Sequence, residues 1–438
     1  MLLDSAKFVG REEILHYINY VARQVLKIDD NQVSFKTKVR RATFSHATSM
    51  WNLENLDLVS GDIQSRQHTF LVSAVGQLSH PSIPENLSST MSNFKGQAQF
   101  HSSNWPSEEL DINNKVVACI GTGCSAAQLA PEIAPHCREL LIFQRSPGYV
   151  FPKENYKYPQ FVQTLFRIFP FLLRWHRLFL FAFVETLYHA VIPSSSDRPK
   201  LSHRLFTAVF KWDMKRKAPK HLWDQLIPRK DALGMKRLVL SSNWLQMFHL
   251  PNVNLITDPV AKITAHGVVC ESGTPYDGID VLIYATGFRS GKFLYGIDVE
   301  VKETGLNLHR DVWKGDVAQA YNGVTVPNFP NFAIIYGPNT NTGHSSVPTF
   351  QEAGAEHISK LIETVVLQGK RRFEVSSKAF EEFNQREQAL LQGTVWIGKG
   401  HNWYRNNDKG VIVNNYHGST WEFWSTVPYP QFEHYEFV

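Results

Sequence analysis

The sequence predicts an α/β protein built on parallel strands, because three apolar strands each end in a glycine and one of them opens a strand–turn–helix–strand unit. In that unit a strand over 115–120 is followed by a glycine turn, a helix over 126–133 and a second strand over 139–144. The other two strands cover 70–76 and 279–287. With 438 residues, of which 43% are hydrophobic and 19% charged, the chain has the composition of two or three globular domains.

The remaining elements follow in chain order. A helix is expected over 11–28, where Ile14, Ile18, Val21 and Val25 recur at helical spacing, and short antiparallel strands over 32–60. After the strand–turn–helix–strand unit, the chain is expected to be mainly helical from 160 to 250 and to return to short strands from 253 to 290. The last expected elements are a strand over 331–338 and a long helix over 351–368.

Charge and cysteine content exclude several functional classes. The net charge of +5 includes no long Lys/Arg block, so no nucleic-acid partner is expected. The four cysteines and the histidines show no metal-binding spacing, so no metal site is expected. Unpaired cysteines and the lack of a signal sequence at the start of the chain suggest an intracellular, cytoplasmic protein.

The segment 160–192 is rich in Phe and Leu. Arg167, Arg174, Arg177 and Glu185 interrupt it, so no membrane-spanning helix is expected. Two interpretations remain. The favoured one is a pair of amphipathic helices that cover a pocket, and the other is peripheral contact with a membrane surface.

The pattern Gly121-x-Gly123-x-x-Ala126 has the chemistry of a dinucleotide site. The first glycine permits the tight turn, the second lets the backbone approach a pyrophosphate, and the small third residue lets the helix pack on the strand. The free N–H groups at the start of the helix favour an anion. At the end of the next strand, Arg145 and Ser146 suit the 2′-phosphate of NADPH, where an NAD site would carry a carboxylate.

A second motif lies just before this unit. Phe94, Gly96, His101, Trp105 and Pro106 closely resemble the FxGxxxHxxxWP fingerprint of the type I Baeyer–Villiger monooxygenases, which are flavoproteins that use FAD and NADPH. The loop between the glycine and the histidine is one residue longer here. The resemblance implies that His101 belongs to a linker that couples two nucleotide-binding domains.

The resemblance continues along most of the chain. The segments that carry it are 74–76 with Pro81 and Pro84, 280–288, 337–346, 394–396 and 402–404. It implies two Rossmann-like, doubly wound domains of three layers. The expected division is 1–90 as a partial FAD-binding domain, 91–290 as the NADPH-binding domain with a helical insert at about 155–235, and 291–438 as a return to the FAD-type domain with an aromatic tail.

Arg237 matches the position of the family's essential arginine, in the segment 234–238 that precedes 250–253. A fixed guanidinium there would stabilise the negative charge of a flavin–oxygen adduct and of the adduct's product with a ketone. Lys236 would help to position the cofactor. The residues assigned to cofactor binding are Gly121, Thr122, Gly123, Cys124, Ser125, Ala126, Ala127, Gln128, Arg145, Ser146, Lys236, Thr286 and Gly287.

The family's first glycine turn, which holds the FAD pyrophosphate, has no counterpart in the sequence. Three explanations stay open: an incorrect start, a divergent enzyme with weakened or shared flavin binding, and a non-catalytic remnant. In a doubly wound sheet the first strand is central, so its loss is expected to expose neighbouring strands on both sides.

The resemblance implies an enzyme that uses O₂ and NADPH to convert a ketone into an ester or lactone. The aromatic insert suggests a bulky apolar ketone, such as the polyketide or terpenoid ketones of fungal secondary metabolism. One alternative is oxidation at nitrogen or sulfur by a related flavin monooxygenase. The other is an NADP-binding protein without catalytic activity that acts through partners.

Overall fold

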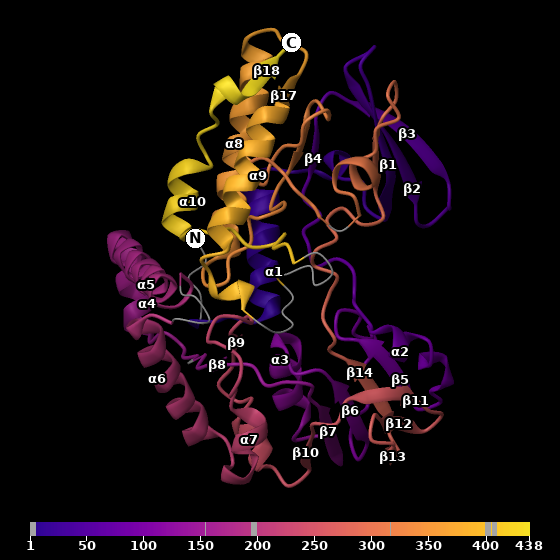
Figure 1. Cartoon of the computed structure of the whole chain (residues 1–438), viewed down its shortest axis with the longest axis vertical. Helices are drawn as coiled ribbons and strands as arrows, with labels where there is room; N and C mark the ends of the chain where they lie inside the picture. The colour runs from indigo at the N-terminus through magenta and orange to yellow at the C-terminus, as the bar shows by residue number, and fades with distance from the viewer. Residues whose placement is uncertain (1–5, 154, 194–198, 316, 399–403, 405–409) are drawn as a thin grey trace.

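The computed structural model describes residues 6–153, 155–193, 199–315, 317–398, 404 and 410–438. Figure 1 shows two lobes, one above the other, with a group of helices along one side of the molecule. The lower lobe contains the glycine turn. The upper lobe contains strands from the early part of the described chain together with its last part.

The lower lobe is built on a five-stranded parallel sheet in the order β10-β7-β6-β14-β5. Its strands are β5 (Ala98–His101), β6 (Val116–Ile120), β7 (Glu139–Phe143), β10 (Val253–Ile256) and β14 (Val281–Tyr284). Every residue of β6 and β14 is buried, because helix α3 (Cys124–Ile133) packs on one face and a small antiparallel sheet on the other. That sheet consists of β11 (Val260–Ile263), β12 (Gly267–Cys270) and β13 (Pro275–Asp277). The predicted strand–turn–helix–strand unit is confirmed, with its helix starting two residues earlier.

The upper lobe combines two sheets, a further strand pair of β17 (Phe373–Val375) and β18 (Tyr435–Phe437), and two long helices. A four-stranded sheet has the order β15-β1-β2-β3, and β16 pairs with β4 in parallel. The strands are β1 (Thr37–Ser45), β2 (Met50–Asp57), β3 (Ile63–His68), β4 (Leu71–Ser73), β15 (Asp298–Val301) and β16 (Phe332–Ile334), and the helices are α8 (Val347–Leu367) and α9 (Ser377–Leu391). The antiparallel strands expected after residue 32 are confirmed, while β15 joins β1 from more than 250 residues away, a pairing that local pattern does not predict.

The start of the described chain differs from expectation in its packing. The predicted helix forms as α1 (Arg11–Tyr20) and continues as a π turn (Val21–Val25), but none of its residues is buried. Ile14 and Ile18 are 47% and 55% exposed. The expectation that loss of a central strand exposes its neighbours stays a prediction, because β4 and β16 pair directly with each other. Within the described residues this leaves β4 with a partner on one side.

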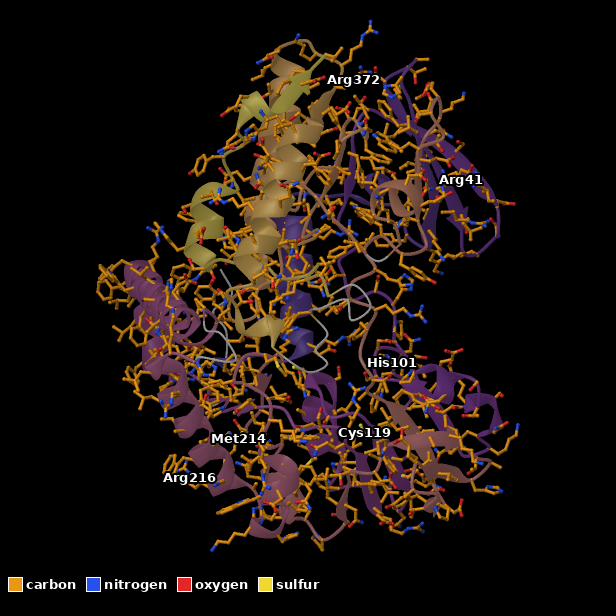
Figure 2. All side chains as sticks on the ribbon, viewed as in Figure 1. Arg41, His101, Cys119, Met214, Arg216 and Arg372 are labelled. Carbon is orange, nitrogen blue, oxygen red and sulfur yellow. The ribbon has the colours of Figure 1, made fainter. Side chains whose placement is uncertain are left out.

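The helices at the side of the molecule lie within the region 160–250, which was expected to be mainly helical. They are α4 (Gln160–Ile168), α5 (Pro170–Val191), α6 (Leu201–Lys217) and the short α7 (Trp223–Leu226). In α6, Met214 lies in the core while Arg216 is exposed on the opposite face (Figure 2). Among the described residues, no helix has the length and apolar character needed to cross a membrane.

Candidate functional site

The glycine turn lies at the carboxyl end of the central strand β6. Gly121 has a φ of +111°, and a Cβ at this position would overlap the carbonyl oxygen of Ala285 at the end of β14. A side chain is therefore excluded by both backbone conformation and space. At Gly123 a Cβ would meet no protein atom within 4 Å, so the turn faces open space there.

Helix α3 starts directly after this turn. Gly123 is its N-cap, and no side chain caps the helix, so the first backbone N–H groups face the same open space. Ala126 and Ala127 are 0% and 2% exposed, and this close packing of α3 on the sheet explains the need for small residues. The geometry is that of an anion-binding turn.

Three polar residues gather beside the turn from distant parts of the sequence. Lys236 Nζ donates to Ser146 Oγ at 2.8 Å and pairs with the Asp231 carboxylate at 2.5 Å. Ser146 follows β7, and its neighbour Arg145 is exposed. The structure thus brings Lys236, a residue predicted from the later segment, to the pair at the end of β7.

Arg237 lies between the two lobes. Burial raises the pKa of the Cys124 thiol, and the Arg237 guanidinium opposes that rise. Tyr336 lies just beyond β16 in the upper lobe. Burial raises its pKa to about 12, and the charge of Arg237 opposes this rise as well. Arg237 is exposed, and its charge acts both on the first residue of α3 and on Tyr336 beyond the end of β16. Its neighbour Leu238 accepts a hydrogen bond from Cys124 Sγ at 3.8 Å through its carbonyl oxygen.

Gly234, three residues before Arg237, opens the segment 234–238, but no role was expected for it from the sequence. It has a φ of +85°, and a Cβ there would lie 2.9 Å from Val191 at the end of α5. Val395 N–H donates to the Ile192 carbonyl at 3.1 Å next to this contact. The backbone that carries Arg237 is therefore held between the helical insert and the C-terminal part of the chain.

The fingerprint residues lie at the connection between the lobes. His101 ends β5 at the margin of the lower lobe (Figure 2). Its Nδ1 is 2.8 Å from Ser103 Oγ. Its ring packs edge-on against Phe288, with 5.4 Å between the ring centroids. Burial lowers the pKa of His101, and the Gly287 backbone partly offsets this effect. The longer loop therefore still places His101 against the segment that leaves β14.

The other fingerprint residues have structural roles at the same edge of the lower lobe. Phe94 is buried, and its ring covers Gly96 so closely that a Cβ on the glycine would overlap it. Trp105 is 44% exposed and packs edge-on against Phe100 at 4.9 Å. Pro106 is half-buried beside it.

Two connecting segments run side by side between the lobes. Thr286 Oγ1 donates to the Ser82 carbonyl at 2.5 Å, and Ser82 N–H donates to the Gly287 carbonyl at 2.8 Å. Pro81 and Phe288 form a further antiparallel bridge. Thr286 and Gly287, predicted as cofactor-binding residues, are thus part of the link that fixes one lobe relative to the other.

A cavity of about 350 Å³ lies in the upper lobe, at the ends of β4 and β16. Ala74, Gly76, Ile335 and Tyr336 line it together with residues of α8. The Ser73 hydroxyl, at the end of β4, is buried and has no hydrogen-bond partner within the described structure. Tyr336 has a φ of +60°, which is unusual for a tyrosine and was not foreseen.

A buried polar cluster joins the helical insert to the C-terminal part. The Glu185 carboxylate of α5 accepts hydrogen bonds from the backbone N–H groups of Thr420 at 3.1 Å and Trp421 at 3.3 Å, and lies 3.3 Å from His344 Nε2. Burial would raise the pKa of Glu185, but these hydrogen bonds hold it at about 2. Burial lowers the pKa of His344, against the effect of Glu185. The sequence had singled out Glu185 only as an interruption of an apolar segment.

In the aromatic C-terminal segments, Trp396 and Tyr404 are buried and pack against each other, with 5.8 Å between their ring centroids. Residues 402 and 403, which are part of the same expected signature, lie outside the described residues.

Several known proteins are similar in sequence to this chain. Residues 2–166 match the L-lysine 6-monooxygenase/L-ornithine 5-monooxygenase family. The chain is 33% identical to the FAD-binding monooxygenase ktnD of Aspergillus niger over 94% of its own length and 67% of the relative's. It is 29% identical to a Baeyer–Villiger monooxygenase of Pseudomonas aeruginosa over 88% of its length and 70% of the relative's.

Solved structures share the fold. OTEMO in complex with FAD and NADP aligns with a TM-score of 0.83 at 22% identity, over 99% of this chain and 86% of that one. Cyclohexanone monooxygenase of Rhodococcus sp. Phi1 bound to NADP⁺ aligns with a TM-score of 0.83 at 21% identity, over 100% and 86%. The chain spans about two thirds of the length of its curated relatives, with 64% in a monooxygenase of Sinorhizobium fredii. By sequence similarity and fold, the chain belongs to the flavoprotein monooxygenase family that includes the type I Baeyer–Villiger monooxygenases.

Proposed function

We propose that this chain acts as an FAD- and NADPH-dependent monooxygenase that converts a bulky apolar ketone into an ester or lactone. One atom of O₂ enters the bond between the carbonyl carbon and its neighbour, the other leaves as water, and NADPH supplies the two electrons. The position of Arg237, between the glycine turn at Cys124 and the cavity side at Tyr336, is the observation that carries this proposal.

The residues present fit NADPH. Gly121 and Gly123, with the start of α3, would hold the pyrophosphate, because the turn faces open space where a Cβ would project. Ser146, Lys236 and Arg145 would hold the 2′-phosphate, since they supply one hydroxyl and two cations at the end of β7.

The residues present also fit part of an FAD site. The cavity at the ends of β4 and β16 lies beside the first turns of α8, and Ser73, which precedes the lining residue Ala74, has a buried hydroxyl without a partner in the described structure. In open α/β sheets, ligands bind at the carboxyl ends of the parallel strands. The flavin supplies the oxygen chemistry when it is bound. We propose 1–90 and 291–438 as the two parts of the FAD-type domain, and 91–290, with the insert at about 155–235, as the NADPH domain.

Arg237 would stabilise the negative charge that develops on the reacting oxygens. A guanidinium stays protonated at every working pH and, once fixed, needs no reorganisation during the reaction. The contact of Gly234 with α5 fixes the backbone that carries it. His101, against Phe288 and Gly287, would keep the two lobes in register, so that both cofactors reach Arg237.

The substrate class is proposed from the apolar insert and from the relatives. The Pseudomonas aeruginosa relative is a Baeyer–Villiger monooxygenase, and the Aspergillus niger relative is an FAD-binding monooxygenase. These favour a ketone, of the polyketide or terpenoid kind found in fungal secondary metabolism. Oxidation at nitrogen or sulfur is the second candidate, because residues 2–166 match a family of lysine and ornithine monooxygenases.

The test uses the purified chain with FAD, NADPH and O₂, and offers it an apolar ketone and a thioether together. We expect the ester or lactone as the main product, and formation of sulfoxide alone would favour the second candidate. A visible spectrum is recorded first. If added FAD gives no protein-bound flavin band while NADPH still binds, the chain is an NADP-binding protein and the proposed activity is wrong.

A further inference from the structure

Helix α5 presents an apolar face to solvent. Phe171, Trp175, Leu178, Phe179 and Phe183 recur at helical spacing, and each is at least half exposed. Trp175 and Phe179 reach 67% and 68% exposure. The buried residues of α5 lie in its last two turns, so the first two thirds of this 22-residue helix do not pack into the core. Contiguous apolar surface of this kind marks an interaction site.

The two neighbouring helices extend the same surface. In α4, Phe161, Leu165 and Ile168 are exposed at helical spacing and belong to a helix without a buried residue. Helix α4 packs against α5, and α5 against α6. These helices lie along the outer side of the molecule, away from the five-stranded and the four-stranded sheet (Figure 1).

Helix α6 repeats the pattern. Leu201, Leu205, Val209 and Trp212 are between 59% and 70% exposed, at spacings of four, four and three residues. We call the exposed apolar side chains of α4, α5 and α6 the apolar ridge. A lid would bury its apolar stripe against a pocket, whereas these side chains point to solvent, so the pocket interpretation does not account for the ridge.

The charges around the ridge are positive. Arg167, Arg174 and Arg177 are the exposed charged residues of α4 and α5, while the single acid, Glu185, is buried and engaged with the C-terminal part. Helix α6 carries five Lys and Arg residues against one acid, Asp213, which pairs with Lys217 at 2.6 Å.

We propose that the apolar ridge binds the surface of an anionic lipid bilayer, with α4, α5 and α6 lying in the interface. Exposed Phe, Leu and Trp side chains would enter the boundary between headgroups and acyl chains, and the arginines would contact lipid phosphates. The charge pattern favours this partner over a second copy of the chain, because a symmetric contact through the ridge would bring the arginines of both copies together.

The test is sedimentation of the purified chain with vesicles of phosphatidylcholine, alone or mixed with phosphatidylserine. We expect binding to the anionic vesicles that weakens as salt is added. The double variant Trp175→Glu/Phe179→Glu should bind at least about 100-fold more weakly, because it removes the apolar anchor. Arg174→Ala/Arg177→Ala should weaken binding to anionic vesicles by about 30-fold, at roughly fivefold for each cation near the surface.

The matched control is Val366→Glu/Leu367→Glu. It adds the same charge at two exposed apolar residues at the end of α8, far from the ridge, and should bind vesicles like the unchanged chain. Circular dichroism and thermal unfolding show whether each variant is folded. Equal vesicle binding by the ridge variant and this control would overturn the proposal. So would a chain that ignores vesicles and forms a dimer in ultracentrifugation that the ridge variant abolishes.

Discussion

Two of the parallel sheets in the described structure, the five-stranded sheet and the β4–β16 pair, contain similar strands in different surroundings. In the lower lobe, β14 is followed by Gly287 and has a partner on each side, β6 and β5, so all four of its residues are buried. In the upper lobe, β4 is followed by Gly76 and pairs with β16 on one side, and Val72 remains 38% exposed. Both glycines have positive φ angles, of +91° and +71°.

The difference lies in what stands next to each strand. Beside β14 is the strand–turn–helix unit of β6, Gly121, Gly123 and α3, which has the geometry to hold a pyrophosphate. Beside β4 the described residues supply no such unit, although α1 lies in the same lobe with its apolar residues exposed. A glycine-ended strand therefore becomes part of a nucleotide site only when a glycine turn and a helix start lie next to it.

The largest effect is expected at Arg237, whose charge acts on groups of both lobes. Arg237→Ala should lower the rate of oxygenation by about 100- to 1,000-fold, the usual loss when a fixed electrostatic stabiliser is removed. Reduction of the flavin by NADPH should continue, and stopped-flow absorbance separates the two steps. Arg229→Ala, which removes an exposed arginine paired with Asp224, is the control. Equal loss of both steps would show that Arg237 acts in cofactor binding.

The second effect distinguishes the two glycines of the turn. Gly121→Val should destabilise the fold by about 3 kcal/mol or more, because it combines a disfavoured φ with an overlap on Ala285. Gly123→Ala should leave the free energy of unfolding nearly unchanged, since its Cβ meets no protein atom, but weaken NADPH binding strongly. Urea unfolding and calorimetric titration measure the two quantities. Unchanged NADPH affinity in Gly123→Ala would remove the turn from the cofactor site.

A third effect tests the choice between NADPH and NADH. Arg145→Ala should raise the dissociation constant of NADPH by about 10- to 100-fold, the range for one charge-assisted hydrogen bond, and leave that of NADH unchanged. Arg138→Ala, at another arginine of the same lobe, serves as control. If both cofactors lose affinity equally, Arg145 does not contact a 2′-phosphate.

A pH effect is expected where the helical insert meets the C-terminal part. The pKa of Glu185 is lowered in the fold to about 2 from an ordinary value of 4.5. Its contribution to stability is therefore complete above pH 4.5 and is lost as the pH falls towards 2. Thermal unfolding of Glu185→Gln should show a smaller decrease in Tm across this window than the unchanged chain. Parallel decreases in Tm would mean that other carboxylates dominate.

The smallest effects are expected at Thr286, just after β14, and at Ser73, the last residue of β4. Thr286→Val should cost about 1 kcal/mol, because it removes the hydrogen bond to the Ser82 carbonyl. Ser73→Ala should change the free energy of unfolding by less than about 0.5 kcal/mol, because its hydroxyl has no partner within the described structure. A large cost at Ser73 in urea unfolding would indicate that the hydroxyl has a partner in the folded protein in solution.

Local sequence pattern was sufficient to predict the strand–turn–helix–strand unit. The spacing of Gly121, Gly123 and Ala126 between two apolar strands fixes a strand, a turn and a helix over fewer than thirty residues, and contacts of this range follow from local pattern. The family motifs also identified the family, because their order along the chain is a property of the sequence alone.

Contacts between residues that are far apart in the sequence became visible only in the tertiary structure. Lys236 reaches Ser146 across 90 residues, Arg237 lies close to both Cys124 and Tyr336, and Glu185 meets Thr420 across 235 residues. The tertiary structure also decided that the apolar residues of α1 and of the ridge stay exposed, although their spacing is that of ordinary buried helices. Periodicity shows which side chains share a face, but only the packing of the whole chain shows whether anything covers that face.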